Sequence, residues 1–210
     1  MRIDKLITGN KKFKDSKFLK LENKFTNLVK YGQKPAVLFI GCSDSRVVPD
    51  LIVNSKPGDL FTVRNIGNFV PPYKPDQDYH GTSSAIEYAV SVLGVQDIIV
   101  CGHSHCGACA ALYEDLSDSE ELIHVHKWLE LGKKAVNKKF FTLTDKKKKE
   151  KILRKTEKES LKYQLENLLT YPEIYKRVKE SKLHIHGWYY KIEDGTIEYY
   201  DGEKQKFKPL

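Results

Sequence analysis

The 210-residue chain lacks any apolar run that approaches the roughly 20 residues of a membrane span. Its N-terminal segment, residues 1–12, also lacks the continuous apolar stretch of a secretory signal peptide. These two absences favour a cytoplasmic protein with no membrane partner. The chain has only four cysteines, and a reducing cytoplasm disfavours disulfide bonds between them. Three of the four lie within nine positions, beside histidines, which is more typical of metal binding.

Acidic residues are too few to balance the basic ones, and the net charge is +8. One segment, Lys146–Lys158, holds most of this excess, because its eight lysines and arginines face only two glutamates. Such a run is usually the solvated face of a helix. The chain has no aromatic-rich platform for single strands and no motif that reads the major groove, so we expect no nucleic-acid partner. The alternative is a non-enzymatic, zinc-stabilised module that binds nucleic acid or an acidic surface through this run, with steeply salt-dependent affinity.

The distribution of apolar residues predicts a single domain of the α/β class, with a core at 34–210 preceded by a helical arm at 1–33. Four segments have the length and composition of buried strands in a parallel sheet, at 36–40, 60–63, 97–101 and 183–188. A hairpin signal, Asp194-Gly195, leads into a further strand at 196–200. Helices are expected at 82–93, 107–112, 120–138, 146–169 and from Pro172 onward. The pattern predicts a central, mostly parallel sheet of about four strands with an antiparallel edge strand, flanked by helices.

Cys42, His103 and Cys106 form a set that is typical of a zinc site. Two thiolates and one imidazole leave the fourth tetrahedral position of zinc open, which is the arrangement of a catalytic site. Cys42 follows the first predicted strand and His103 the third, and in open α/β sheets ligands bind beyond the carboxyl ends of the strands. Cys106 comes at the start of the next helix, whose N-terminus stabilises a thiolate.

Asp44 and Arg46 follow Cys42 closely and predict assistance to the metal centre. Because two thiolates neutralise the charge of zinc, its bound water is acidified less than in a three-histidine site. Asp44 can accept a hydrogen bond from a zinc-bound hydroxide, and Arg46 can pair with Asp44 and keep it ionised. Two alternatives stay open at this point. Asp44 could bind zinc as the fourth ligand and close the site, or the pair could be an ordinary surface ion pair.

Five ordered motifs give the chain a resemblance to the β-class carbonic anhydrases. They are Cys42-Ser43-Asp44-Ser45-Arg46-Val47, Pro57-Gly58-Asp59-Leu60-Phe61, Arg64-Asn65-Ile66-Gly67-Asn68, Ala85-Ile86-Glu87-Tyr88-Ala89-Val90 and Gly102-His103-Ser104-His105-Cys106-Gly107. The resemblance covers about residues 32–112, with a weaker likeness at 185–188. It implies the zinc-dependent interconversion of carbon dioxide and bicarbonate, by attack of a zinc-bound hydroxide on carbon dioxide. It also implies one zinc per chain and a homodimer or larger homo-oligomer such as a tetramer, with N-terminal helices that reach onto the neighbouring subunit.

The resemblance assigns roles by position. It makes Cys42, His103 and Cys106 the zinc ligands, and Asp44 with Arg46 the pair that orients the nucleophile. It makes Gln33 a donor to a substrate oxygen, Phe61, Ile66 and Tyr88 the apolar wall that holds carbon dioxide, and Gly107 a backbone donor to bicarbonate. Without the family, the three wall residues would be ordinary core and Gln33 a polar loop residue. Phe39 stands where some bacterial members have a tryptophan that lines a regulatory bicarbonate pocket, so the resemblance favours the open zinc site.

Other interpretations share parts of this pattern. A related zinc hydrolase that acts on carbon disulfide or carbonyl sulfide would use the same ligands and differ only in the access to its pocket and the shape of that pocket. A zinc deaminase would need a Pro-Cys-x-x-Cys pair and a nearby His-x-Glu, and neither occurs here. The proton released in the reaction could leave through His105, His80 or buffer.

Overall fold

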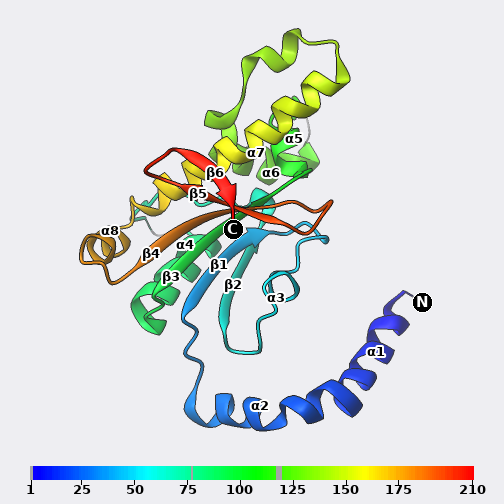
Figure 1. The fold of residues 1–210 in the computed structure, drawn as a ribbon, viewed down its shortest axis with the longest axis vertical. Coiled ribbons are helices and arrows are strands. Elements are labelled where there is room, and N and C mark those ends of the chain that lie inside the picture. Colours follow the sequence, from blue (N-terminus) through cyan, green and yellow to red (C-terminus); the bar gives the residue numbers. More distant parts are fainter. Residues whose placement is uncertain (1, 77, 117–119) are drawn as a thin grey trace.

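The computed structural model describes residues 2–76, 78–116 and 120–210, and within them a single six-stranded sheet forms the centre (Figure 1). The strands are β1 (Val37–Cys42), β2 (Leu60–Asn65), β3 (Asp97–His103), β4 (His184–Tyr190), β5 (Ile197–Asp201) and β6 (Lys206–Pro209). Their order across the sheet is β2-β1-β3-β4-β5-β6. The first four run parallel, and β5 and β6 extend the sheet in antiparallel fashion. The predicted α/β class and mostly parallel sheet are confirmed.

Helices and helical turns connect and cover these strands. They are α1 (Ile3–Lys12), η1 (Phe13–Phe18), α2 (Leu19–Tyr31), α3 (Pro49–Ile52), η2 (Ile66–Asn68), α4 (Gly81–Glu87), η3 (Tyr88–Leu93), α5 (Gly107–Ala111), η4 (Glu120–Leu122), α6 (Ile123–Leu129), η5 (Glu130–Ala135), η6 (Lys138–Thr142), α7 (Lys146–Leu168) and α8 (Pro172–Lys179). In the described part of the chain, no helix is both long and apolar enough to cross a membrane.

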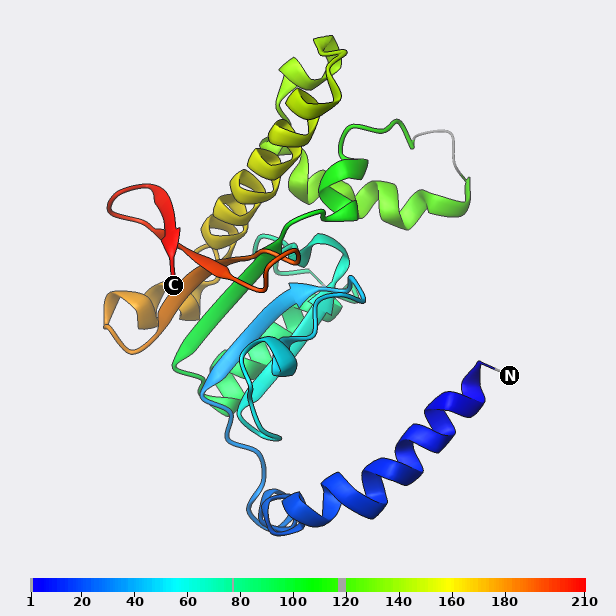
Figure 2. The same cartoon turned by 45° about the vertical axis from the view of Figure 1, so that its right-hand side comes forward.

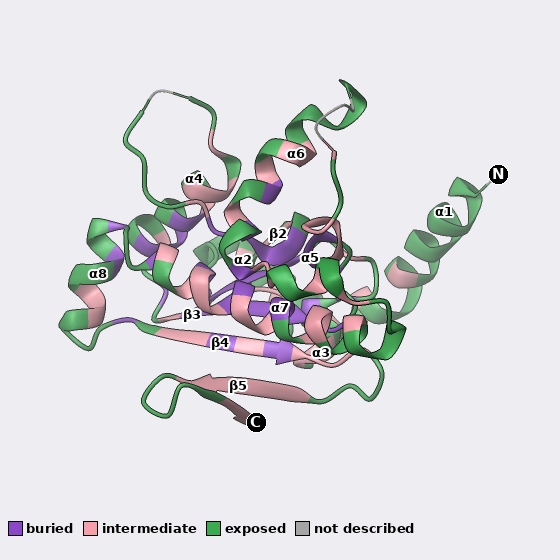
Figure 3. Ribbon diagram, turned by 90° about the horizontal axis from the view of Figure 1, so that it is seen from above, coloured by how far each residue is buried: buried purple, intermediate pink, exposed green. Residues whose placement is uncertain are grey.

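The core follows from the alternation of side chains along the two central strands. On one face, residues such as Leu38 and Ile98 pack in a large buried cluster with side chains of α4, η3, α7 and α8. On the other face, Phe39 and Ile99 belong to a smaller cluster that includes Trp188 of β4. Figure 3 shows the buried residues concentrated in the sheet and on the helix surfaces that face it.

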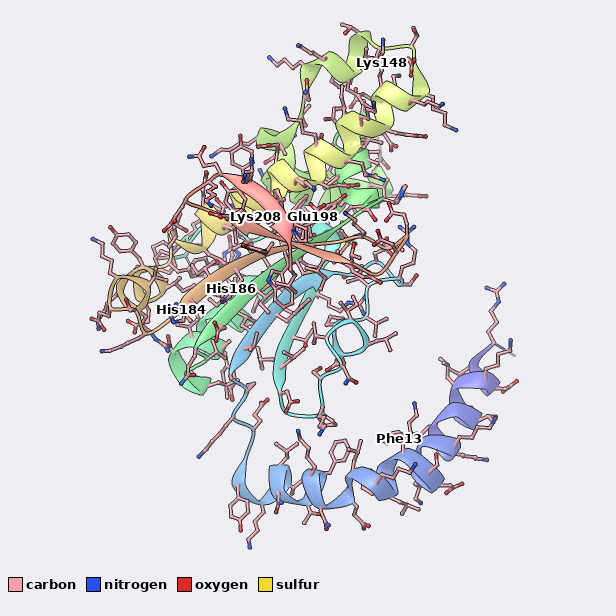
Figure 4. All side chains as sticks on the ribbon, in the orientation of Figure 1. Phe13, Lys148, His184, His186, Glu198 and Lys208 are labelled. Carbon is pink, nitrogen blue, oxygen red and sulfur yellow. The ribbon has the colours of Figure 1, made fainter. Side chains whose placement is uncertain are left out.

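Only the second half of the long helix α7 packs in the hydrophobic core. Its first residue follows Asp145, whose side chain caps the helix by accepting a hydrogen bond from the Lys148 amide at 2.9 Å. This basic half projects beyond the sheet, and Lys148 lies at its far end (Figure 4). The second half carries Leu161 and Leu168 into the core. The predicted solvated face therefore describes the first half, while the second half packs against the sheet.

The N-terminal arm, α1 to α2, stands away from the sheet beyond the amino ends of its strands (Figure 2). None of its described residues is buried. Phe18 packs its ring between those of Phe13 and Phe25 along the arm. An ion pair of 2.8 Å from Lys24 to Asp59 connects the arm to the loop before β2. A single chain thus leaves the apolar residues of the arm largely uncovered.

Two expectations about the elements need correction. The helix expected at 120–138 is present over 120–135 as three consecutive segments, η4, α6 and η5, of which only α6 is an α-helix. It ends earlier than expected, because the chain becomes extended at Val136. Gly132 allows close packing there, since a Cβ at this position would lie 2.7 Å from the Phe69 ring. The C-terminal tail after Gly202, for which the sequence predicted no element, forms β6 and completes a hairpin with β5. Figure 4 labels Glu198 and Lys208, which lie in this hairpin.

Candidate metal centre

The three predicted metal ligands converge at the carboxyl edge of the sheet. Cys42 is the last residue of β1, His103 is the last residue of β3, and Cys106 directly precedes α5. Because β1 and β3 are parallel neighbours, their ends reach the same edge. The Sγ atoms of the two cysteines and a ring nitrogen of His103 all lie within 4.8 Å of one another. All three residues are buried, at 5% exposure or less.

The His103 ring is oriented as a metal ligand. Its Nδ1–H donates a hydrogen bond of 2.9 Å to the Ser104 carbonyl, which leaves the lone pair on Nε2. That Nε2 atom is buried and has no hydrogen-bond partner. A buried nitrogen without a partner is costly, and a metal ion coordinated between it and the two thiolates would satisfy it. The donor set of two sulfurs and one imidazole fits zinc.

The two candidate cysteine ligands are surrounded by backbone amides and by buried side chains. The amides of Asp44 and Gly67 each approach the Cys42 Sγ at 3.4 Å. Gly67 has a φ of +78°, and a Cβ there would lie 2.8 Å from the Phe69 ring, so only glycine suits this turn. The contact with the Cys106 thiol and burial raise the pKa of Cys42 to about 12. The pKa of Cys106 is raised too, by the nearby Cys109 thiol and by burial.

Asp44 and Arg46 form a two-pronged ion pair beside the metal ligands. Arg46 Nε donates to Asp44 Oδ1 at 2.9 Å, and Arg46 Nη2 donates to Oδ2 at 2.7 Å. These bonds to the guanidinium hold the pKa of Asp44 well below its usual range. Arg46 also donates to the His105 carbonyl at 3.0 Å, which ties the pair to the ligand loop. Among the described residues, the group of converging ligand atoms does not include Asp44.

Glu193, which the sequence did not single out, supports the loop between His103 and Cys106. Its carboxylate accepts hydrogen bonds from Ser104 Oγ and, at 3.1 Å, from His105 Nε2. The Ile192 amide donates to Ser104 Oγ at 2.9 Å. His105 has a φ of +58°, an uncommon conformation for a residue with a side chain, so these contacts stabilise a strained turn. Among the candidate proton carriers, His105 is thus paired with Glu193, and His80 is paired with Asp76 at 2.6 Å.

A shallow apolar pocket lies next to the ligands. It has a volume of about 370 Å³ and is lined by Ser43, Asn65, Ile66, His124, Val125 and Trp128. Ile66 directly follows Asn65, the residue that pairs with Cys42 in the sheet, and its side chain is half-exposed. Trp128 donates its indole N–H to the Ile66 carbonyl at 2.7 Å. The sequence contained no signal for His124 or Trp128, because α6 begins 16 residues after Gly107, where the preceding motif ends.

Gly107, the predicted backbone donor, is the first residue of α5 and is exposed next to Cys106. Amides in the first turn of a helix have no acceptor within the helix. The Gly107 N–H is therefore available to an oxygen of a ligand at the metal centre.

The other three predicted pocket residues lie toward the opposite end of the sheet. Phe61 pairs in register with Leu38, four residues before Cys42. Tyr88 packs its ring on Phe61 with 5.9 Å between centroids, and Gln33 precedes the amino end of β1. A single chain therefore does not bring Gln33, Phe61 or Tyr88 to its own metal ligands.

A second group of potential ligands, Asp76, Asp78 and His80, also has donor atoms within 4.8 Å of one another. Its members are exposed or half-buried, and Asp76 is already paired with Lys74 at 2.6 Å and with His80. None of its ligand atoms is a buried nitrogen or sulfur without a hydrogen-bond partner. The group at Cys42 is therefore the better candidate metal centre.

Known proteins resemble this chain along nearly its whole length. Residues 37–197 match the family model described as carbonic anhydrase. A carbonic anhydrase of Synechocystis sp. is 41% identical over 208 residues, which cover 98% of this chain and 73% of the relative. A carbonic anhydrase of Pseudomonas aeruginosa is 41% identical over 180 residues, which cover 85% of this chain and 79% of the relative.

Solved structures show the same similarity in three dimensions. The β-carbonic anhydrase CcaA aligns over the full length of both chains with a TM-score of 0.90 and 39% identity. A tetrameric β-carbonic anhydrase from Sordaria macrospora aligns with a TM-score of 0.78 and 31% identity, over 94% of this chain and 96% of that one.

The four cysteines allow a matched test of the ligand set. We expect Cys42→Ala and Cys106→Ala to lose most of the bound zinc, because each removes one of three ligands. The buried neighbours Cys101 and Cys109 lie outside the group, so Cys101→Ala and Cys109→Ala should keep about one zinc per chain. Elemental analysis after dialysis against a weak chelator measures this. Equal zinc loss in all four variants would contradict the assignment.

Zinc affinity should depend steeply on pH. In the metal-free chain the raised pKa values keep both ligand thiols protonated between pH 6.5 and 9, and zinc binds the thiolates. Each zinc therefore releases two protons, and its affinity should rise by about a hundredfold per pH unit in this range. Chelator competition at several pH values measures the slope. A pH-independent affinity would show that the thiols are not the ligands.

Proposed function

Because the chain belongs to the β-class carbonic anhydrases, we propose that it catalyses the reversible hydration of carbon dioxide to bicarbonate and a proton, with zinc held by Cys42, His103 and Cys106. The observation that carries the proposal is the convergence of these three donors beside an Asp44 that Arg46 holds away from them. Zinc would supply a Lewis acid whose open position binds water and lowers the pKa of that water. We further propose that the enzyme acts in the cytoplasm.

Asp44 is proposed to orient the attacking water. Its two oxygens accept hydrogen bonds from Arg46, so it stays ionised at neutral pH and remains an acceptor. An ionised carboxylate that is engaged by a guanidinium gains less from binding zinc, which supports the open rather than the closed site. Arg46 is itself anchored on the His105 carbonyl, so the pair keeps a fixed position relative to the ligand loop. A fixed acceptor directs the proton of the water away from carbon dioxide and leaves a lone pair for the attack.

The substrate carbon is proposed to lie against the apolar side of the site. Ile66 offers a half-exposed aliphatic surface next to the end of β1, which suits an uncharged molecule. As bicarbonate forms, negative charge develops on its oxygens. The Gly107 N–H, at the start of α5, can donate to one of these oxygens and stabilise that charge.

Gln33, Phe61 and Tyr88 are proposed to act in the site of a second copy of the chain. Phe61 and Tyr88 pack on each other near the amino end of the sheet, and Gln33 precedes β1 at the same end. Tyr88 is 45% exposed. The arm with its uncovered apolar residues lies beyond the same end. We propose a homo-oligomer, a dimer or a tetramer, in which these residues complete the apolar wall and the donor set of a neighbouring subunit. The tetrameric relative from Sordaria macrospora supports such an assembly.

The rival functions are less well supported. A hydrolase of carbon disulfide or carbonyl sulfide would share the ligands, but the relatives described above are named carbonic anhydrases. A non-enzymatic basic module is contradicted by membership of an enzyme family over residues 37–197.

Replacement of Asp44 should separate catalysis from metal binding. We expect Asp44→Asn to lower kcat for carbon dioxide hydration by roughly a hundredfold or more, while about one zinc per chain remains bound. The control is Asp201→Asn, which removes a carboxylate that is paired with Lys208 in the β5–β6 hairpin. Stopped-flow hydration assays with parallel zinc analysis make the comparison. Unchanged turnover in Asp44→Asn would remove this residue from the mechanism.

Mixed oligomers test whether Gln33 serves a neighbouring subunit. Gln33→Ala alone should lose most activity, and Cys106→Ala alone should lose its metal. A mixed dimer would contain one site with both the intact ligands and an intact Gln33. Random co-assembly in equal amounts should therefore restore about a quarter of the wild-type sites. An activity equal to the mean of the two separate variants would show that Gln33 does not act across subunits.

A further inference from the structure

Glu157 is a buried carboxylate that the proposed reaction does not use. It lies in the middle of α7, and its side chain is only 1% exposed. Its Oε1 accepts a hydrogen bond from the Cys106 amide at 3.0 Å and one from Arg154 Nη2 at 2.6 Å. Its Oε2 accepts from the Tyr189 hydroxyl at 2.7 Å. Three donors, from the ligand loop, α7 and β4, thus meet on one carboxylate.

Burial of a carboxylate costs free energy, and three hydrogen-bond donors offset that cost for Glu157. Burial raises the pKa of Glu157, whereas its bonds to Tyr189, Arg154 and the Cys106 amide oppose that rise. Arg154 also neutralises the charge, so Glu157 adds no net charge next to two thiolates. An apolar side chain at this point of the helix would avoid the cost but would leave the Cys106 N–H without a partner.

The hydrogen bond to Cys106 acts on a turn of the site that contains a non-glycine residue with a positive φ. The Cys106 amide belongs to the peptide that follows His105, the residue with a φ of +58°. Arg46 holds the carbonyl of this same peptide at 3.0 Å. The peptide is therefore fixed at its oxygen by Arg46 and at its nitrogen by Glu157. A rotation of this peptide would move the Cα–Cβ bond of Cys106 and with it the Sγ atom.

The sheet brings α7 close enough for this contact. A Cβ at Gly102, next to His103, would lie 3.9 Å from the backbone oxygen of Glu157, so the helix packs directly on the end of β3. Tyr189 pairs with Gly102 across the β3–β4 ladder, which places its hydroxyl on the same carboxylate. The contact is thus built from the two strands beside the metal ligands and the helix that covers them.

We propose that Glu157 is a positioning residue for the metal centre: its carboxylate accepts the Cys106 N–H and so sets the direction in which the Cys106 thiolate meets zinc. The proposal rests on the metal centre of the proposed function but not on the reaction carried out there. Partners in the second coordination sphere of protein metal sites typically contribute about 10- to 100-fold in metal affinity.

Two variants of similar volume separate the acceptor from the packing. Glu157→Gln keeps an oxygen that can accept from the Cys106 amide, and its NH₂ group can donate to the Tyr189 oxygen. Glu157→Met fills the space but offers no comparable acceptor. The matched control is Gln164→Met, on the same helix. Gln164 is equally buried, but it accepts from the Val70 amide and donates to the Leu131 carbonyl, away from the ligands.

The readouts are zinc affinity, by chelator competition, and the visible absorption of the Co²⁺-substituted protein. We expect Glu157→Met to raise the zinc dissociation constant by about 10- to 100-fold and to change the cobalt spectrum. In Glu157→Gln and Gln164→Met the zinc dissociation constant should stay within about threefold of the wild-type value, because the Cys106 contact is kept. Both variants should also keep the cobalt spectrum of the wild type. An unchanged zinc affinity and spectrum in Glu157→Met would overturn the proposal, as would an equal loss in Gln164→Met.

Amide hydrogen exchange tests the proposal without Glu157→Met, in case that variant does not fold. In the zinc-loaded protein, the Cys106 amide should exchange with solvent far more slowly than the amide of the exposed Gly107, and Glu157→Gln should preserve this protection. Rapid exchange of the Cys106 amide would overturn the proposal. None of these readouts involves carbon dioxide, so a chain that binds zinc as described but fails to hydrate carbon dioxide would disprove the proposed function alone.

Discussion

The parallel pairing of β1 with β3 is the constraint on which the site depends. It ends both strands at one edge of the sheet, so that Cys42 and His103 face the same point although 61 positions separate them. The short turn after β3 then returns Cys106 to that point at the start of α5. Both strands are buried on their two faces, which holds their ends still. The proposed metal centre, with three protein ligands, would require this rigidity, because its fourth position would contribute nothing to holding the protein together.

Arginine side chains balance the carboxylates that lie around the candidate metal ligands. With zinc bound, two thiolates would join Asp44 and the buried Glu157 in bringing negative charge to a small volume. Arg46 and Arg154 each neutralise one carboxylate, and a divalent metal would neutralise the thiolates. Arg46 does this while it also fixes the His105 carbonyl, so electrostatic balance and geometry come from the same contact. The arrangement explains why Asp44 is held beside the metal ligands rather than among them.

The sequence predicted the parts of the site that are encoded locally. Strand-length apolar segments followed at once by Cys42 and His103 were sufficient to place both residues at one edge of a parallel sheet. Glu157 and Glu193 could not be found in this way, because their importance comes from contacts 51 and 89 positions away along the chain. In a lysine-rich helix, Glu157 had the pattern of one more solvated charge. Gln33, Phe61 and Tyr88 came from the family resemblance alone, and their position far from their own metal ligands was not encoded in any local pattern.

The most direct test of the account is a crystal structure of the zinc-loaded protein at pH 7, with anomalous data at the zinc edge. We predict zinc bound to Cys42 Sγ, His103 Nε2 and Cys106 Sγ, with a non-protein ligand in the fourth position and Asp44 still paired with Arg46. Zinc bound elsewhere, or an Asp44 that has left Arg46 to become the fourth ligand, would contradict it.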